Sequence, residues 1–429
     1  MKQFRIIAAL ILAYMVFAIL LNSVGTVILQ SIASYGVSKA QAGSLEGFKD
    51  IPIALTSFLL ATLIPRIGYR RGIMLGLGLV ALACIAMPLM DSFWMTRMMF
   101  LVTGAAFGIV KVSVYSSIGL LTASRQAHAA LTNTIEGMFM IGVLAGYWLF
   151  GGFIDDADPG GDSWLQVYWV LSALCLVSIG LMAISRLDES GTRVAGERIT
   201  EGFGRMLSLL TRPLVLVFVI SAWLYVLIEQ SIGTWLPTFN NEVLQLPNAM
   251  SVQMASIFAA TLAIGRLSAG MLLRHMSWHV LLNLCVVAMG VLVLLTLPLA
   301  AGIAPGQVTG WSTAPLAAWL FPLIGLFMAP IYPAINSVML SALPRHQHAP
   351  MTGLIVIASA LGGTTGSMLT GVLFGRLGGE TAFYLTLVPM AAILASLWLF
   401  KRETDRVGVQ LDPETADPAA AAQKDPLVP

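Results

Sequence analysis

Long apolar runs separated by short polar turns make up most of the chain. A helix that crosses a bilayer needs about 20 apolar residues, and twelve runs come close to that length or exceed it. Because a helix satisfies its own backbone hydrogen bonds in lipid, the pattern predicts an all-α membrane protein. The expected spans are 6–32, 40–64, 72–90, 94–122, 129–153, 164–186, 213–239, 249–273, 278–300, 313–341, 349–375 and 380–400.

The longest polar connector between spans covers residues 187–212 and divides the spans six and six. It mixes Arg and Glu, which indicates a cytoplasmic linker with an amphipathic helix. Residues 1–186 and 213–400 are therefore expected to form two six-helix bundles. Residues 401–429 end in a stretch rich in Pro, Ala and Asp, and we expect them to form a disordered cytoplasmic tail.

The two halves also resemble each other. Moving the second half back by about 208 positions places helix 7 on helix 1, as in transporters built from repeats. Asn22 then falls opposite Gln230, two amides at matching depth. The charges do not follow this symmetry, because Glu46 and Asp50 fall opposite Met254 and Phe258.

Lysine and arginine are concentrated in alternate loops, which indicates the cytoplasmic side. The opposite side has little beyond Lys39, Arg97 and Arg376. Both termini are therefore expected in the cytoplasm of a bacterial-type cell, with the chain crossing the inner (plasma) membrane many times.

Composition excludes several other classes. Hydrophobic residues make up 58% of the chain and charged residues 10%, which is too little polar surface for a soluble protein of this size. The net charge of +2 is small and scattered, so no nucleic-acid partner is expected. The three cysteines lie in separate apolar runs without metal-ligand spacing, and no P-loop or catalytic set stands out. We expect no metal, no cofactor and no enzyme activity.

Two halves of six helices, a long central loop and basic turns after helices 2 and 8 resemble the major facilitator superfamily. That resemblance implies the major facilitator fold. Against the superfamily's turn signature, Gly-x-x-x-Asp-Arg-x-Gly-Arg-Arg, the chain matches at Arg66, Gly68 and Arg70. It departs at Ala61, Pro65 and Tyr69, with Arg71 one position late. The missing aspartate puts the superfamily's charge-relay lock between helices in doubt.

Within the superfamily the chain is most similar to the fucose–proton symporter family. The similarity rests on QAG at the start of helix 2, IYPAINSV in helix 10 and TGLIVIASALGGTTG in helix 11. It implies sugar transport by symport. Those symporters have an acidic residue in helix 1 and another in helix 4, whereas this chain has Asn22 and Lys111 near those places.

Seven charged residues lie further inside the expected spans than the first few positions, and each costs about 2.5–3.5 kcal/mol in mid-membrane if it is unpaired. We assign a proton-coupling or charge network to Glu46, Lys49, Asp50, Lys111, Glu136 and Glu229. Lys111 is within reach of Asp50 or Glu136. The alternative is that the helix 2 charges form a locked structural cluster. Arg266, like Glu136, is near a cytoplasmic end and reads as a gate or packing residue.

Tyrosines stand four residues from polar residues on three helices that, by the resemblance, line the central cavity. Such pairs project from one face of a helix. Together with Asn22 and Gln230, they suit a hydroxyl-rich ring such as a sugar. The alternative is an interfacial belt or packing role. The predicted substrate-binding residues are Asn22, Lys111, Tyr115, Tyr225, Glu229, Gln230, Tyr332 and Asn336.

These features predict a secondary transporter that moves a sugar or sugar-like solute, including acidic ones, by alternating access and proton-coupled symport. An uncoupled uniporter and an efflux carrier for amphipathic compounds are the alternatives. The expected partners are a small-molecule substrate, protons and the lipid bilayer, and we expect a monomer driven by the proton gradient.

Overall fold

The computed structural model describes residues 2–60, 64–122, 124–185, 187, 189, 204, 206–300, 302–304, 306–344 and 347–407. Within these ranges the regular structure is helical and contains no strand. Most of the predicted linker and residues 408–429 of the predicted tail lie outside the described residues.

The N-terminal half begins with a helix that is broken in two. The helices in order are α1 (Lys2–Asn22), α2 (Val24–Tyr35), α3 (Lys39–Gly43), α4 (Leu45–Leu60), α5 (Ile64–Ile67), α6 (Tyr69–Met90), α7 (Phe93–Leu121), α8 (Arg125–Gly151) and α9 (Val167–Ile184).

The C-terminal half repeats this pattern, including a break in its first long helix. Its helices are α11 (Pro213–Gly233), α12 (Leu236–Glu242), α13 (Asn248–Leu272), α14 (Trp278–Thr296), α15 (Leu316–Leu320), α16 (Ile324–Met328), α17 (Ile331–Ser341), α18 (His348–Leu377), α19 (Gly379–Tyr384) and α20 (Leu387–Val407).

Local sequence explains several helix starts. Ser38 and Gln41 form a capping box at the start of α3, and the Ser92 hydroxyl accepts a hydrogen bond from the backbone N–H of Met95 at 3.2 Å. Each cap satisfies a backbone N–H that has no partner within the helix. Pro213 begins α11, where a missing N–H does no harm.

The described residues contain eleven helices long and apolar enough to cross a membrane. Each predicted span except 40–64 coincides with one of them, although the predicted span 6–32 is divided at Ser23 into α1 and α2. The predicted span 40–64 falls on α3, α4 and α5, with residues 61–63 outside the described part. The predicted start of the tail at residue 401 is wrong, because α20 continues to Val407. Its last turns are stabilised by Lys401 with Asp405 at 2.5 Å and Arg406 with Glu403 at 2.6 Å, pairs spaced for neighbouring helix turns.

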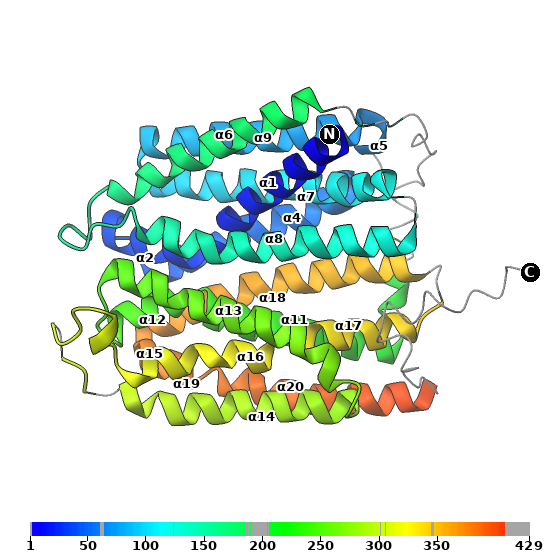
Figure 1. The fold of residues 1–429 in the computed structure, drawn as a ribbon. Coiled ribbons are helices and arrows are strands. Elements are labelled where there is room, and N and C mark those ends of the chain that lie inside the picture. Colours follow the sequence, from blue (N-terminus) through cyan, green and yellow to red (C-terminus); the bar gives the residue numbers. More distant parts are fainter. Residues whose placement is uncertain are drawn as a thin grey trace, which may run out of the picture.

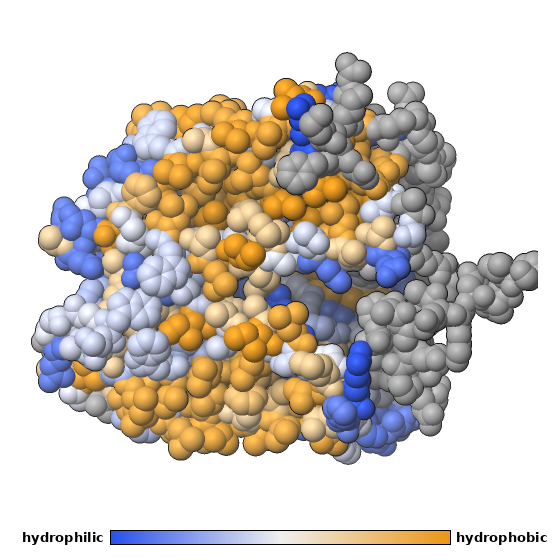
Figure 2. Space-filling model, in the orientation of Figure 1, coloured by the Kyte–Doolittle hydropathy of each residue, from blue (hydrophilic) through white to orange (hydrophobic). Residues whose placement is uncertain are grey.

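The helices form two groups, α1–α9 above and α11–α20 below in Figure 1, and the start of α1 and the end of α20, the first and last described parts of the chain, lie toward the same end of the molecule. The outer surface of each group is largely apolar in Figure 2, with leucines such as Leu89 and Leu267 strongly exposed. That surface suits hydrocarbon. Figure 2 also shows a recess between the two groups that opens toward the termini and contains hydrophilic residues.

At the end opposite to the termini the two groups are joined by polar and aromatic contacts. Lys39 of α3 forms an ion pair with Glu242 of α12 at 2.8 Å, and Trp148 of α8 stacks on Trp311 with ring centroids 5.6 Å apart. The helices α3 and α4 also pack against α18 at this end. We call this set of contacts between the two groups the seam. The bundles therefore close against each other on one side and separate on the other.

We expect replacement of Gly104 by Ala to destabilise the fold. A Cβ at this position of α7 would lie 2.2 Å from the Lys49 carbonyl oxygen, so α4 and α7 would have to move apart. Overpacking of this kind costs about 1–3 kcal/mol. Gly119→Ala on the same helix is the matched control, since a Cβ there meets nothing within 4 Å. Thermal unfolding in detergent checks this, and equal melting temperatures for the two variants would contradict it.

Candidate functional site

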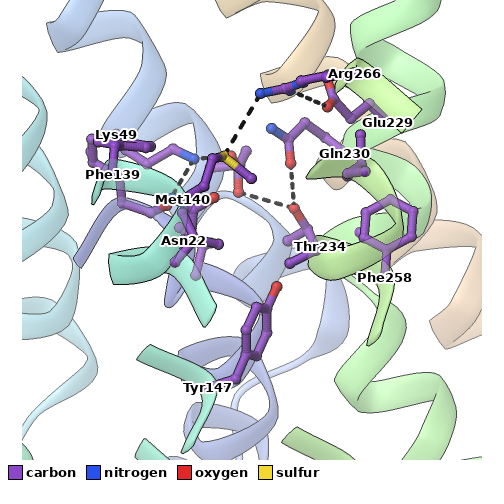
Figure 3. A pocket seen from close by; sticks show the side chains of 18 residues that line it. Asn22, Lys49, Phe139, Met140, Tyr147, Glu229, Gln230, Thr234, Phe258 and Arg266 are labelled. Atoms are coloured by element: carbon purple, nitrogen blue, oxygen red, sulfur yellow. Dashed lines mark hydrogen bonds and ion pairs between the residues drawn. The ribbon is translucent and has the colours of Figure 1, made fainter. Parts of the chain in front are cut away.

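A cavity of about 170 Å³ lies between the two bundles, and its walls come from α1, α2, α4 and α8 on one side and α11 and α13 on the other. It adjoins the broken parts of two helices, at Ser23 between α1 and α2 and at Thr234 between α11 and α12. Breaks of this kind are tolerated in a membrane where the backbone lines a cavity. Figure 3 shows polar side chains from both bundles directed at this space.

Lys49 is the centre of the charged wall of the cavity. Its ammonium group donates to the Glu46 carboxylate and, at 3.2 Å, to the Leu21 carbonyl oxygen beside the break in the first helix. It also lies 3.5 Å from Asp50. Glu46 has no exposed surface, and its second oxygen accepts a hydrogen bond from Thr234 of the other bundle at 3.3 Å. One buried ion pair therefore links both halves of the molecule.

Asp50 lies beside the cavity rather than on its wall. Its carboxylate is directed at α18, where a Cβ at residue 363 would lie only 2.3 Å from an Asp50 oxygen. Gly363 thus leaves the space that the carboxylate occupies. The Asp50 side chain is 13% exposed, whereas the Glu46 side chain is fully buried.

Arg266 of α13 and Glu229 of α11 form a second, looser charged pair. The guanidinium and carboxylate are 3.8 Å apart, and the Arg266 side chain is 47% exposed. Figure 3 shows Arg266 extending toward Met140 of the other bundle, whose sulfur is 3.9 Å from the guanidinium. Arg266 therefore presents a positive charge at the interface between the bundles.

Uncharged polar groups complete the site. Asn22 and Gln230, the two amides that the repeat aligned, both line the cavity. The Gln230 side-chain oxygen lies 2.8 Å from the Thr234 hydroxyl, whose single proton is shared between Gln230 and Glu46. The Tyr147 hydroxyl is directed toward the cavity in Figure 3 and has no hydrogen bond to the residues that the structure describes.

The predicted residues of helices 4 and 5 gather elsewhere, within the N-terminal bundle. Tyr115 donates a hydrogen bond to Glu136 and packs edge-on to Tyr14. Lys111 is exposed and lies 5.8 Å from the centre of the Phe107 ring, and it makes no ion pair within the described ranges. The expected pairing of Lys111 with Asp50 or Glu136 is therefore absent, because Lys49 and Tyr115 already hold these carboxylates.

The predicted residues of helix 10 form a third group, in the C-terminal bundle. Tyr332 stacks on the buried Tyr225 with ring centroids 5.4 Å apart, and its hydroxyl is 2.7 Å from Ser359. The side-chain oxygen of Asn336 is buried without a hydrogen-bond partner among the described residues. These residues do not line the cavity, so their stacking supports the packing interpretation of the tyrosines.

A family model described as the Major Facilitator Superfamily matches residues 7–319. The chain belongs to this superfamily. It is a transporter and not an enzyme, with many helices across the membrane. No curated protein sequence matches it.

Solved structures of superfamily members share its fold at low sequence identity. A bacterial homologue of the human lysosomal transporter Spinster, solved inward-facing and unoccupied, is 15% identical with a TM-score of 0.75, over 95% of this chain and 98% of that chain. The nucleoside transporter NupG is 13% identical with a TM-score of 0.69, over 92% and 98%. The transporter FucP in its outward conformation is 16% identical with a TM-score of 0.58, over 93% and 99%.

In the basic turn after helix 2, a carboxylate from elsewhere in the chain bonds to the turn in place of the missing aspartate. Pro65 stands where the signature has aspartate, but Glu189 beyond α9 accepts a hydrogen bond from the Arg70 backbone N–H at 2.8 Å. The Arg70 side chain donates to the carbonyl oxygens of Met182 and Ala183, at 3.0 and 2.5 Å. Gly68 has a φ of 98° and Arg71 is exposed. The Arg66 side chain lies outside the described part.

Sequence reasoning missed part of the cavity wall. Arg266 was recognised as a charge within a span, but its depth suggested a gate or packing role. Thr234 and Tyr147 had no signal of their own, since each stands beside a tryptophan in a run that resembles an interfacial belt. Only the packing of the two bundles brings these three side chains together.

Two lysines of this superfamily member provide a matched test of the charged wall. Lys49→Met would leave Glu46 and Asp50 as neighbouring carboxylates without their cation, and breaking a buried pair in this way costs about 3–5 kcal/mol. Lys111→Met should have little effect, because Lys111 is exposed and makes no ion pair with described residues. Melting temperatures in detergent measure both. A Lys49 variant as stable as the Lys111 variant would contradict the structural role.

Proposed function

We propose that the protein carries a small, polar, hydroxyl-bearing solute across the membrane by alternating access, coupled to protons. The observation that supports this best is the cavity between the bundles, because residues of both halves face it and it is closed by the seam on one side. A carrier that rocks one bundle against the other needs its binding site at that interface.

The size of the cavity favours a solute of sugar dimensions. Its volume of about 170 Å³ is below the 300–1,000 Å³ typical of sites for drug-sized ligands. An efflux carrier for amphipathic compounds would need a larger and less polar space. The described wall instead offers amides, a threonine, a tyrosine hydroxyl and four charged side chains.

Proton coupling is supported by the charge balance around Lys49. One ammonium group faces two carboxylates, Glu46 and Asp50, so the cluster has one negative charge in excess when all three are ionised. A proton on Asp50 would remove that excess, since Glu46 is held more closely by Lys49 and by Thr234. The carboxylate can then alternate between ion pair and neutral acid, which links proton binding to movement of α4 against α18.

The distribution of Lys and Arg among the loops supports one orientation of the protein in the membrane. The excess of Lys and Arg in loops on the termini side favours the cytoplasm for that side. The recess then faces the cytoplasm and the seam faces outward, in the inner membrane of a bacterial-type cell. With Asp50 protonated from outside, the carrier would act as an importer.

Uptake by proteoliposomes tests this function. We expect a radiolabelled panel of sugars and sugar acids to include a solute that accumulates faster when the outside is made acidic. Asp50→Asn should abolish the effect of the gradient, because the carboxylate that exchanges the proton is gone. Asp155→Asn, a change in an exposed loop, is the control that should retain it.

Two outcomes would contradict the proposal. Equal uptake with and without the gradient would indicate an uncoupled uniporter. Gradient-driven uptake that persists in the Asp50 variant would exclude Asp50 as the required proton site.

A further inference from the structure

The two cations on the cavity wall differ in how far their hydrogen-bonding groups are occupied. Lys49 has three N–H donors, and three acceptors surround it: Glu46, the Leu21 carbonyl oxygen and Asp50. Its side chain is 8% exposed. Lys49 is therefore occupied by the protein itself and has nothing to offer a solute.

Arg266 is in the opposite situation. A guanidinium has five N–H donors in a planar fork, yet the contacts of Arg266 with described residues are Glu229 at 3.8 Å and the Met140 sulfur at 3.9 Å. Neither provides an oxygen within hydrogen-bonding distance. The side chain is 47% exposed and lines the cavity. An arginine within a membrane-spanning helix costs free energy unless it is paired. Guanidinium N–H donors that face a cavity without an acceptor are therefore suited to an anionic ligand.

We propose that Arg266 binds a carboxylate group of the transported solute and that Glu229 takes this position when the site is empty. This inference rests on the proposed function and names its substrate class: a small polyhydroxylated acid. A planar carboxylate matches the guanidinium fork through two parallel hydrogen bonds, which Glu229 at 3.8 Å does not make. The solute carboxylate would displace Glu229 from Arg266.

The other end of the cavity suits the uncharged part of such an acid. The Tyr147 hydroxyl and Asn22 lie away from Arg266 across the space in Figure 3, and Gln230 lies between the two ends. Hydroxyl groups of the solute can bond to these side chains. The Met140 contact also places Arg266 against the opposite bundle, so an anion bound there would be held between the halves.

Calorimetric binding to the purified full-length protein tests this with two matched pairs of probes: D-glucuronate with D-glucose, and D-gluconate with D-glucitol. Each pair differs by one carboxylate in place of a hydroxymethyl group. We expect the acid to bind about tenfold or more tightly than its neutral partner, since a charge-assisted hydrogen bond contributes about 1.5–3 kcal/mol. Arg266→Gln should abolish this preference, and the exposed Arg376→Gln should retain it.

The variant Glu229→Gln separates a displaced ligand from a structural ion pair. Without the competing carboxylate, the ratio of acid affinity to neutral-partner affinity should rise above that of the unmodified protein. This variant remains informative if Arg266→Gln proves unstable. The circular dichroism spectrum and melting temperature of each variant establish that it is folded.

Several results would overturn the inference. They are equal binding within each pair, no binding by either acid, a preference that survives Arg266→Gln, or a ratio of acid affinity to neutral-partner affinity that does not rise in Glu229→Gln. Loss of the preference in Lys111→Gln alone would move the anion site into the N-terminal bundle and also overturn it. Failure of proton coupling in the uptake assay would leave these binding results unchanged, so the two proposals fail separately.

Discussion

The arrangement of the two bundles depends on one ammonium group placed among carboxylates inside the membrane. Lys49 holds Glu46, Asp50 and the backbone beside the break in the first helix, and Glu46 reaches Thr234 of the other half. Each charge would be costly in hydrocarbon by itself. Because they satisfy one another at the interface, the cluster both stabilises helix 2 and closes the seam between the halves. The structural cluster and the proposed proton site are thus the same set of atoms.

The sequence predicted what depends on local spacing. Apolar runs predicted the helical membrane fold, and the alternative of a locked structural cluster on helix 2 agrees with the ion pair between Glu46 and Lys49. The repeat aligned Asn22 with Gln230, and both line the cavity. These features follow from helix periodicity, which a single sequence displays directly.

What the sequence could not supply depends on how the helices pack. Lys111 seemed able to reach Asp50 by depth alone, but depth does not say which way a side chain faces, and Lys49 satisfies that carboxylate instead. Arg266 looked peripheral because α13 places its Cα near a helix end, whereas its long side chain extends to the cavity. The end of α20 was misplaced since charged residues there pair along the helix instead of ending it.

The proposed proton site implies that the seam opens when the charge balance of the Lys49 cluster changes. Spin labels on Ala40 of α3 and Thr381 of α19, both exposed, would report the separation of the bundles at the seam. Labels on Gln126 of α8 and Thr352 of α18 would report the other side. Double electron–electron resonance should show the first distance lengthening and the second shortening in Asp50→Asn, which mimics the protonated carboxylate, relative to the unmodified protein. Distances that stay the same at both ends would contradict this account.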